Sequence, residues 1–390
     1  MKKALPLLFL LFLFFLAPLM VYYPQESLIA ARDGLHLWFT VALPALFPFL
    51  VVAELIMNLR LASLVGLFLE PLMRPLFRLP GPAGVVVAVG FTTGFPIGAI
   101  MTTRLIEQGL LTRSEGERLA LFTNNASPLF LLGVVGTALL GQPEIGLLIA
   151  CSHYGANFLL GIFYGFSARN SEISKPIIQG SLLSRIGLEW NRFLSDTKPP
   201  GEVIGQSVIK AMNNVIAIGG YLIFFTVVFR LFYASGILDS LIRLFETILQ
   251  WFHFTPELAK GLLAGLMEMT IGCQQVVATD APLLEKVLLL SFILAWSGLS
   301  IQAQVAAFLV QSAVPIHRYV KARLYQGFLS VFLSYLLFQF WPLSQATQET
   351  APLLSNNLWP YWPGLIGLFY IALAIVLLLL AYGRRIVTRS

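Results

Sequence analysis

The sequence predicts an all-α polytopic membrane protein built from two inverted repeats, each with an amphipathic helix, a re-entrant hairpin and broken transmembrane helices. Hydrophobic residues make up 57% of the 390 residues and charged residues only 11%, whereas soluble domains carry about 25% charged residues. The mean hydropathy is +0.81. So little polar surface excludes an ordinary soluble enzyme, a disordered chain and a disulfide-stabilised secreted module. The recurrence and the repeated order of apolar segments predict the rest of the architecture.

The net charge and the cysteines indicate no further partner or cofactor. The formal net charge is +6, but no run of Lys and Arg is longer than two residues. We therefore expect no nucleic-acid partner and interpret the charge as the signal that orients spans in a membrane. Cys151 and Cys273 lie far apart in apolar segments, which predicts neither a disulfide framework nor a zinc site. No cofactor is expected.

Apolar segments long enough to cross a membrane recur along the chain. A spanning helix needs about 20 apolar residues. The segments that qualify are 4–23, 35–57, 119–140, 145–166, 203–230, 287–310, 324–341 and 363–383. The first follows Lys2 and Lys3, but its apolar run exceeds the about 7–15 residues of a signal peptide. We expect it to be an uncleaved anchor.

Two further segments, 81–103 and 258–279, are also long enough to cross, but polar residues and Gly interrupt each in its middle. Basic residues concentrate on the cytoplasmic side of membrane proteins. If both segments crossed, the basic residues would be divided almost evenly between the two sides. If both return to the side from which they entered, 20 of the 25 Lys and Arg residues lie on the cytoplasmic side. The sequence therefore predicts eight full spans, two re-entrant hairpins and both termini in the cytoplasm.

The order of the segments is duplicated. Residues 35–166 and 203–341 both run as span, amphipathic segment, interrupted hairpin, span and span. The amphipathic segments, 61–78 and 236–253, carry apolar residues at helical spacing, as interfacial helices do. Each unit contains three spans, an odd number, so the second unit is inverted relative to the first. Many secondary transporters are built this way.

The domain boundaries follow from this duplication. They are an N-terminal anchor and linker (1–33), a first repeat (34–168), a cytoplasmic loop (169–202), a second repeat (203–341), and an extracytoplasmic loop with a C-terminal span (342–390). In inverted-repeat transporters the solute binds near the bilayer midplane, where helices are interrupted. We therefore expect the site at the hairpins and at the spans that follow them.

In the first repeat, polar residues gather at two interruptions. The hairpin contains Thr92 and Thr93, followed by Gly and Pro residues that cost about 1 and 3 kcal/mol in a helix interior. We expect the chain to turn there and to expose helix ends that bind an ion or a polar solute; the alternative is a packing kink. The next span contains Asn124, Asn125 and Ser127, which we interpret as binding residues. The alternative is hydrogen bonding between helices.

The second repeat carries a carboxylate at the corresponding depth. A carboxylate inside a membrane costs about 2.5–3.5 kcal/mol on insertion scales, so Glu268 is a functional candidate. It is a protonatable coupling group, a cation ligand, or a partner of backbone N–H groups from the facing repeat. The other polar residues of this hairpin and of the following span are Thr270, Gln274, Ser297, Ser300 and Gln302.

One further pair of polar residues belongs to the candidate site, and the sequence lacks the common enzyme motifs. His153 and Asn157 are one helical turn apart in the span 145–166 and share a face; a buried His of this kind is more often structural than a ligand. The sequence contains no zinc-protease, serine-hydrolase or phosphate-loop motif. We therefore expect no enzyme, and no catalytic or metal-binding residue.

Several of these motifs resemble the YlbJ-type sporulation integral membrane proteins of endospore-forming bacteria. The matching residues are Pro44-x-x-x-Pro48-Phe49, Leu69-Glu70-Pro71-Leu72-Met73-Arg74-Pro75, Thr93-Gly94-Phe95-Pro96-x-Gly98-Ala99, Phe122-Thr123-Asn124-Asn125, His153-x-x-x-Asn157 and Glu268-Met269-Thr270. The resemblance implies two nucleoside-recognition (Gate) repeats, related to parts of concentrative nucleoside and ferrous-iron transporters. It also implies a role in forming heat-resistant spores, in a mother-cell or forespore membrane. Thr93 and Phe95 stand where the family usually has Ser and Tyr.

The expected function is that of a secondary-transporter-like protein that moves a small polar or nucleoside-like solute across the cell membrane. The alternatives are a non-transporting scaffold that recruits partners through the loop 169–202, and a lipid-handling protein of the spore envelope. The expected partners are the lipid bilayer and the small-molecule solute. A coupling cation and a second copy of the chain are further candidates.

Overall fold

The computed structural model of the protein describes residues 4–59, 61–167, 186–188, 190–191 and 199–340. The predicted C-terminal span 363–383 and most of the predicted loop 169–202 lie outside these residues. Within the described part every regular element is a helix and there is no strand, which confirms the all-α prediction. The principal helices are α1 (Ala4–Tyr22), α2 (Pro24–Leu37), η1 (Trp38–Ala42), α3 (Leu43–Asn58), α4 (Leu61–Phe77), α5 (Ala83–Thr93), α6 (Ile97–Glu107), α7 (Arg113–Thr123), η2 (Leu129–Leu139), α8 (Pro143–Ser167), α10 (Pro200–Ala234), α11 (Asp239–Trp251), α12 (Leu258–Met267), α13 (Met269–Val277), α14 (Leu283–Trp296), α15 (Gly298–Gln311) and α16 (Ile316–Phe340).

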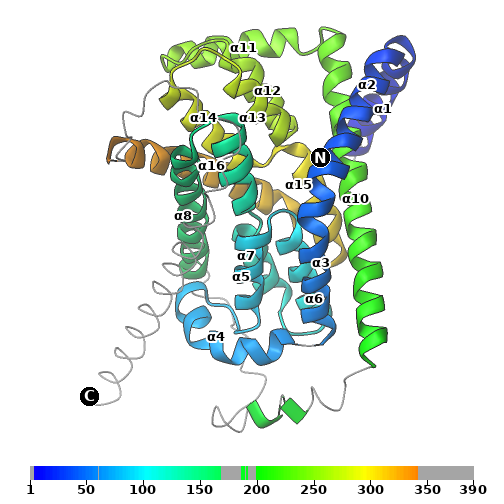
Figure 1. The fold of residues 1–390 in the computed structure, drawn as a ribbon, viewed down its shortest axis with the longest axis vertical. Helices are drawn as coiled ribbons and strands as arrows, with labels where there is room; N and C mark the ends of the chain where they lie inside the picture. Colours follow the sequence, from blue (N-terminus) through cyan, green and yellow to red (C-terminus); the bar gives the residue numbers. More distant parts are fainter. Residues whose placement is uncertain (1–3, 60, 168–185, 189, 192–198, 341–390) are drawn as a thin grey trace.

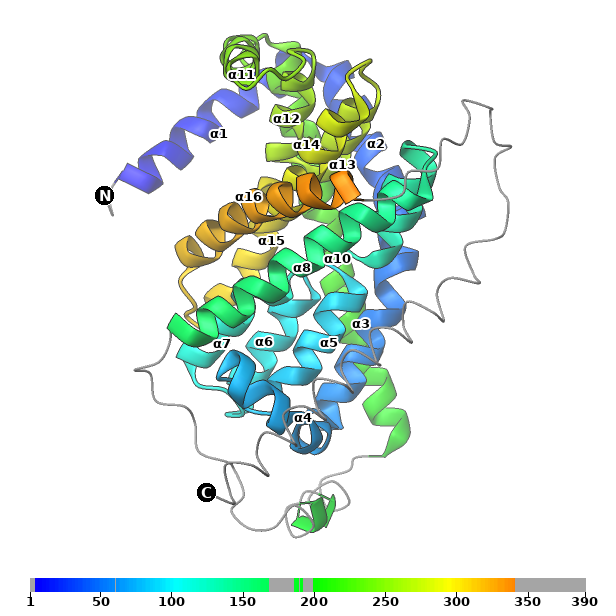
Figure 2. The same cartoon turned by 90° about the vertical axis from the view of Figure 1, so that its left-hand side faces the viewer.

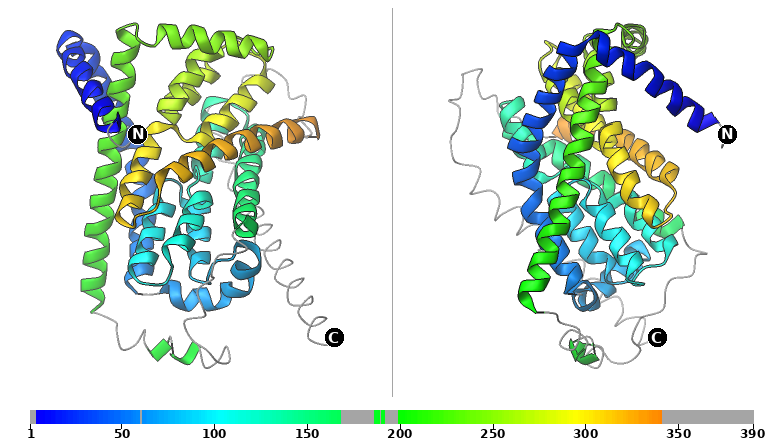
Figure 3. Two further views of the ribbon diagram at one scale, coloured as in Figure 1. Left: turned by 180° about the vertical axis from the view of Figure 1, so that it is seen from behind. Right: turned by 90° about the vertical axis from the view of Figure 1, so that its right-hand side faces the viewer.

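Two long helical segments pack against each other along one side of the molecule. Helices α2, η1 and α3 continue one another and run antiparallel to α10 (Figures 1 and 3). The close approach depends on small residues, since a Cβ on Gly34 would lie 2.9 Å from the Cα atom of Ile223. The Trp38 indole donates to the carbonyl of Val215 at 2.9 Å. Helix α1 bends away from α2 by 103°.

The two predicted amphipathic segments are confirmed as helices, and they lie at opposite ends of the molecule. Helix α4 crosses one end and α11 the other, each roughly across the direction of α3 and α10 (Figure 1). On α11 the apolar side packs towards α12 and buries Leu249, whereas Arg243 on the other side is exposed. The two amphipathic helices therefore join the core from opposite ends of the fold.

At both predicted hairpins a pair of short helices is separated by a non-helical break. Helix α12 runs to Met267 and α13 returns alongside it: a Cβ on Gly272 would lie 2.2 Å from Gly265 Cα, and one on Gly261 would lie 2.7 Å from the Val276 side chain. This pairing of residues shows that the chain reverses at Glu268. Helices α5 and α6 likewise contact each other across the break at residues 94–96.

Three helical stretches of the described part are long and apolar enough to cross a membrane, or up to five if two bent helix pairs each count as one. The three are α8, α10 and Leu283–Gln311, which contains α14 and α15. Helix α16 covers most of the predicted span 324–341 but is not among them. The fold is therefore that of a helical protein with several membrane-crossing segments.

The apolar core has two main parts that meet at α7. One part lies among α3, α4, α5 and α6 and receives Leu119 and Phe122 from α7. The other lies among η2, α8 and α12–α16 and receives Leu121 and, just beyond α7, Ala126. Figure 2 shows α8 and α16 side by side over this second part. The end of α7 therefore lies where the two halves of the fold join.

The glycine contact inside the second hairpin predicts a stability difference between two substitutions. Gly272→Ala should lower the apparent unfolding temperature, because the added methyl group would overlap the backbone of α12, and overpacking costs about 1–3 kcal/mol. Gly220→Ala is the matched control, since nothing lies within 4 Å of a Cβ at that helical position. Thermal unfolding of the purified protein in detergent measures both. Equal unfolding temperatures for the two variants would refute the packing described here.

Candidate functional site

The centre of the candidate site is the break between α7 and η2. Helix α7 begins with a capping box in which Thr112 and Glu115 cap each other's backbone, and it ends at Thr123. Asn124 is extended, with φ −98° and ψ 108°, and η2 begins only after Pro128. Pro128 has no N–H, so the preceding turn cannot close its helical hydrogen bonds. The carbonyl groups at the end of α7 therefore need partners from elsewhere.

Arg323 of α16 supplies those partners. Its Nη1 donates to the carbonyl of Asn124 at 2.6 Å, and its Nη2 donates to the carbonyl of Leu121 and to Asn157 Oδ1, the latter at 3.1 Å. The side chain is fully buried, with 0% exposure. A cation at the C-terminal end of a helix also complements the helix dipole. None of the ion pairs among the described residues involves Arg323, so its charge is balanced by carbonyl groups rather than by a carboxylate.

Asn124 connects this break to the first hairpin. Its Oδ1 accepts from the backbone N–H of Ala99, near the start of α6, at 2.9 Å, and its Nδ2 donates to the carbonyl of Ala120 at 3.0 Å. It thereby caps the N-terminus of α6. The two breaks are also in direct contact, because a Cβ on Gly94 (φ +100°) would lie 3.0 Å from the Ser127 side chain. The interruption between α5 and α6 and the interruption between α7 and η2 thus form one junction, which we call the first junction.

Helix α8 holds the other side of the break. Asn157 Nδ2 donates to Asn125 Oδ1, and the backbone N–H of Ala126 donates to His153 Nε2 at 3.2 Å. Tyr154 Oη donates to the carbonyl of Ala126 at 2.8 Å. These contacts bring together four predicted site residues, Asn124, Asn125, His153 and Asn157. His153 therefore has a hydrogen-bonding role at the break.

An analogous junction lies around Glu268. The Glu268 side chain is 2% exposed and its Oε2 accepts from the backbone N–H of Ile271 at 2.8 Å, which caps α13. This carboxylate therefore meets a backbone N–H of its own hairpin. The break between α14 and α15 lies directly against it: a Cβ on Gly298 (φ +74°) would lie 3.2 Å from Glu268 Cα. Ser297 is left-handed, with φ +69°, and Gln302 Nε2 donates to the carbonyl of Trp296 at 2.9 Å.

Helix α16 connects the two junctions. Tyr319, one turn before Arg323, lies beside Ser297 at the second junction, and the Arg323 guanidinium lies 5.1 Å from the centre of its ring. Buried polar residues continue along the same face of α16 at helical spacing: Tyr319, Arg323, Gln326, Ser330 and Ser334. Ser334 Oγ lies 2.6 Å from both Ser152 Oγ and Ser291 Oγ. This stripe is not among the residues predicted from the sequence, although the helical spacing of its polar residues would have indicated it.

The remaining predicted residues are distributed unevenly around the junctions. Thr93, Thr270 and Ser300 are buried, and Ser127 Oγ accepts from the backbone N–H of Phe130 at 3.2 Å. Thr92 and Gln274 are exposed, and the Thr92 hydroxyl bonds back to its own helix. The structure therefore places the Thr92 and Gln274 side chains outside the buried hydrogen bonds of the two junctions. Within the described residues, no group of three or more His, Cys, Asp or Glu could hold a metal ion.

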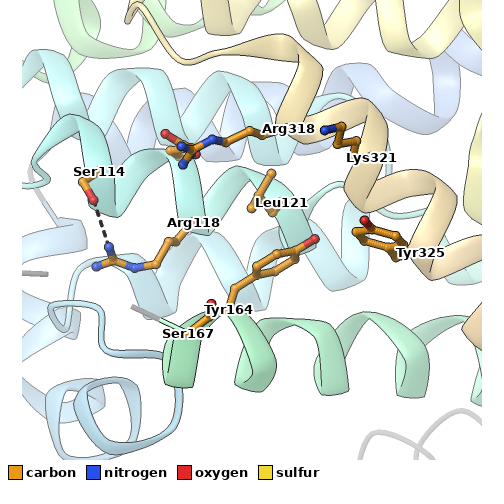
Figure 4. A pocket seen from close by; sticks show the side chains of 9 residues that line it. Ser114, Arg118, Leu121, Tyr164, Ser167, Arg318, Lys321 and Tyr325 are labelled. Carbon is orange, nitrogen blue, oxygen red and sulfur yellow. Dashed lines mark hydrogen bonds and ion pairs between the residues drawn. The ribbon is translucent and has the colours of Figure 1, made fainter. Parts of the chain in front are cut away.

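A surface cleft lies beside the first junction. It has a volume of about 330 Å³ and is formed by the start of α7, the end of α8 and the start of α16 (Figure 4). Leu121, whose carbonyl Arg323 binds, contributes to its lining. The cleft and the buried network therefore share one backbone segment.

The chain has relatives among known proteins. Residues 39–167 match the Gate family, described as nucleoside recognition. The chain is 35% identical over 341 residues to the sporulation integral membrane protein YlbJ of Bacillus subtilis, covering 86% of this chain and 84% of that relative. It is also 31% identical over 85 residues to an uncharacterized protein of Alkalihalophilus pseudofirmus, covering 22% of this chain and 18% of that protein. No solved structure matches the chain.

The hydrogen bonds of Arg323 predict a large stability effect. Arg323→Met should lower the free energy of unfolding by several kcal/mol, because each buried polar group left without a partner costs about 1–3 kcal/mol. Arg323→Lys should be intermediate, since an ammonium group cannot reproduce the guanidinium fork.

The matched control is Arg318→Gln on the same helix, where the side chain is 61% exposed and pairs with Glu117. An exposed pair contributes only about 0–1 kcal/mol. Denaturant unfolding in detergent measures all three variants. An Arg323→Met variant no less stable than Arg318→Gln would contradict the role assigned to Arg323.

Proposed function

The chain belongs to the family of the sporulation integral membrane protein YlbJ, and from that premise we propose that it is a secondary-transporter-like protein that moves a small polar solute across a membrane of the sporulating cell. The family makes it a membrane protein of sporulation with a nucleoside-recognition Gate domain. Transport goes beyond what membership of this family shows, and it is the part that we propose. The observation that carries it is the pair of buried junctions, each formed by a broken hairpin against a broken span and both contacted by α16.

We further propose that the two halves are inverted repeats, with eight spans, two re-entrant hairpins and both termini in the cytoplasm. The segments of the two halves follow one order, α2–α8 and α10–α16. Their long first helices are antiparallel and their amphipathic helices lie at opposite ends (Figure 1), as inversion requires. The distribution of basic residues supports the same topology.

The junctions have the properties of a solute site in a membrane. Charged side chains at membrane depth are expensive and mark solute or ion pathways, and Glu268 and Arg323 are both buried without an ion pair among the described residues. Interrupted helices supply free backbone groups and partial charges at their ends. Because these groups now satisfy one another, a solute would enter by exchanging with them as the two repeats move apart.

The available groups favour a solute rich in acceptor oxygens. Arg323 supplies guanidinium donors, and Asn124, Asn125 and Asn157 supply amide donors. A guanidinium without a carboxylate partner favours carboxylate or phosphate oxygens. A nucleoside-like molecule offers hydroxyl and carbonyl oxygens to the same groups. We propose that Glu268, at the other junction, contacts the solute or a coupling cation.

Replacing the Glu268 carboxylate tests this function. Glu268→Gln keeps an oxygen for the Ile271 N–H but removes the charge, so folding should be preserved and solute or cation binding lost. In a spore-forming host that lacks its own copy, heat-resistant spores should fall about tenfold or more, because a loss of only about 1.4 kcal/mol of binding free energy already lowers the occupancy of the site about tenfold at limiting solute. Glu268→Ala should be as inactive and also less stable, because it removes the cap.

Glu257→Gln is the control, since that side chain is exposed and makes no cap hydrogen bond. The amount of protein in the membrane is measured in parallel for every variant. Normal spore heat resistance with Glu268→Gln, at a normal protein level, would rule out the proposed role of the carboxylate.

A further inference from the structure

The cleft at the ends of α7, α8 and α16 carries more positive charge than its own carboxylate can balance. Arg118, Arg318 and Lys321 line it together with a single acidic residue, Glu117. Figure 4 shows Arg118 on one wall and Arg318 and Lys321 on the other. Arg318 is paired with Glu117 and Arg118 lies near Glu115 as well as Glu117, so Lys321 is the lining cation that pairs with no described carboxylate. Two aromatic side chains, Tyr164 and Tyr325, complete the lining.

Two basic groups in the cleft have unused hydrogen-bond donors. Arg118 is 7% exposed; its Nη atoms donate to Ser114 Oγ at 3.0 Å and to the carbonyl of Arg78 at 3.1 Å. Its Nε is buried and has no partner among the described residues. Lys321 makes no ion pair with a described carboxylate. The Arg118 Nε atom is shielded from solvent, so an anion in the cleft would accept from the exposed Lys321 ammonium group and would be attracted by the Arg118 charge.

The position of the cleft favours a lipid over a soluble anion as its ligand. It lies at the C-terminal end of α8, one of the helices long and apolar enough to span a membrane, and therefore at the level of the lipid headgroups. From there an apolar strip runs along the outer side of α16, where Tyr325, Phe328 and Phe332 are 53%, 61% and 55% exposed. These residues follow helical spacing, so they form one continuous surface for acyl chains.

We propose that this cleft binds the phosphate headgroup of an anionic phospholipid, whose acyl chains lie along the strip on α16. The proposal rests on the membrane placement of the proposed function, but on neither Glu268 nor the buried junctions. Basic pockets between helices at a membrane surface are suited to phosphate headgroups, and Arg pairs with phosphate through charge-assisted hydrogen bonds. Because the cleft is lined by Leu121 of α7 and Lys321 of α16, and Arg323 binds the Leu121 carbonyl, a bound headgroup would hold α7 and α16 together at the first junction.

The test uses the purified full chain in a neutral detergent and measures the apparent unfolding temperature during lipid titration. Phosphatidylglycerol should raise it, whereas phosphatidylethanolamine and inorganic phosphate should raise it much less. Lys321→Gln removes a donor to the phosphate and Arg318→Gln leaves Glu117 uncompensated in the cleft, so each should weaken the phosphatidylglycerol response about fivefold. Arg243→Gln, a change at the opposite end of the molecule on α11, is the control and should respond as the unmodified protein does.

Three outcomes would overturn the proposal. They are an equal response to phosphatidylethanolamine, a full response to inorganic phosphate alone, and an unchanged phosphatidylglycerol response in the Lys321→Gln and Arg318→Gln variants. The Glu268→Gln variant separates this site from the proposed transport function. It should keep the full response to phosphatidylglycerol even though spore heat resistance is lost, and a lost response would also contradict a lipid site independent of Glu268.

Discussion

The rest of this fold depends on the hydrogen bonds that the buried guanidinium group of Arg323 makes. The break after α7 leaves backbone carbonyls in an apolar environment, where unpaired polar groups cannot turn to water. Arg323 binds two of them and also Asn157, and so joins α16 and α8 to the end of α7. Without it, the break would be unstable and the first hairpin would lose the asparagine that caps it.

Both junctions follow one physical rule: a polar side chain at a helix interruption satisfies the backbone of a neighbouring half-helix. Asn124 caps α6 and Glu268 caps α13. Such contacts are directional and few, so a small number of hydrogen bonds fixes the arrangement of the broken helices at each junction. An interruption of this kind can be stable and still exchange its partners with a solute, which connects the packing of this chain to the proposed transport.

Much of this could be predicted from the sequence, and what could not has a physical reason. The all-helical class, the two amphipathic helices and the positions of the breaks follow from composition, periodicity and Gly or Pro placement. The capping partners do not, because Ala99 and Asn124 are brought together only by the turn between α6 and α7. Arg323 was counted among the charges that orient the spans, because its partner Asn124 lies 199 residues away in sequence and no local pattern connects them.

A double-mutant cycle between Arg323→Met and Asn157→Leu is the most direct test of the central claim, that Arg323 holds the first junction together with α8. Unfolding free energies of the two single variants and the double variant would be measured in detergent. The account predicts that the double variant is less destabilised than the sum of the single variants, with a coupling of about 0.5–3 kcal/mol. Strictly additive losses would show that the two residues act independently and would contradict the account.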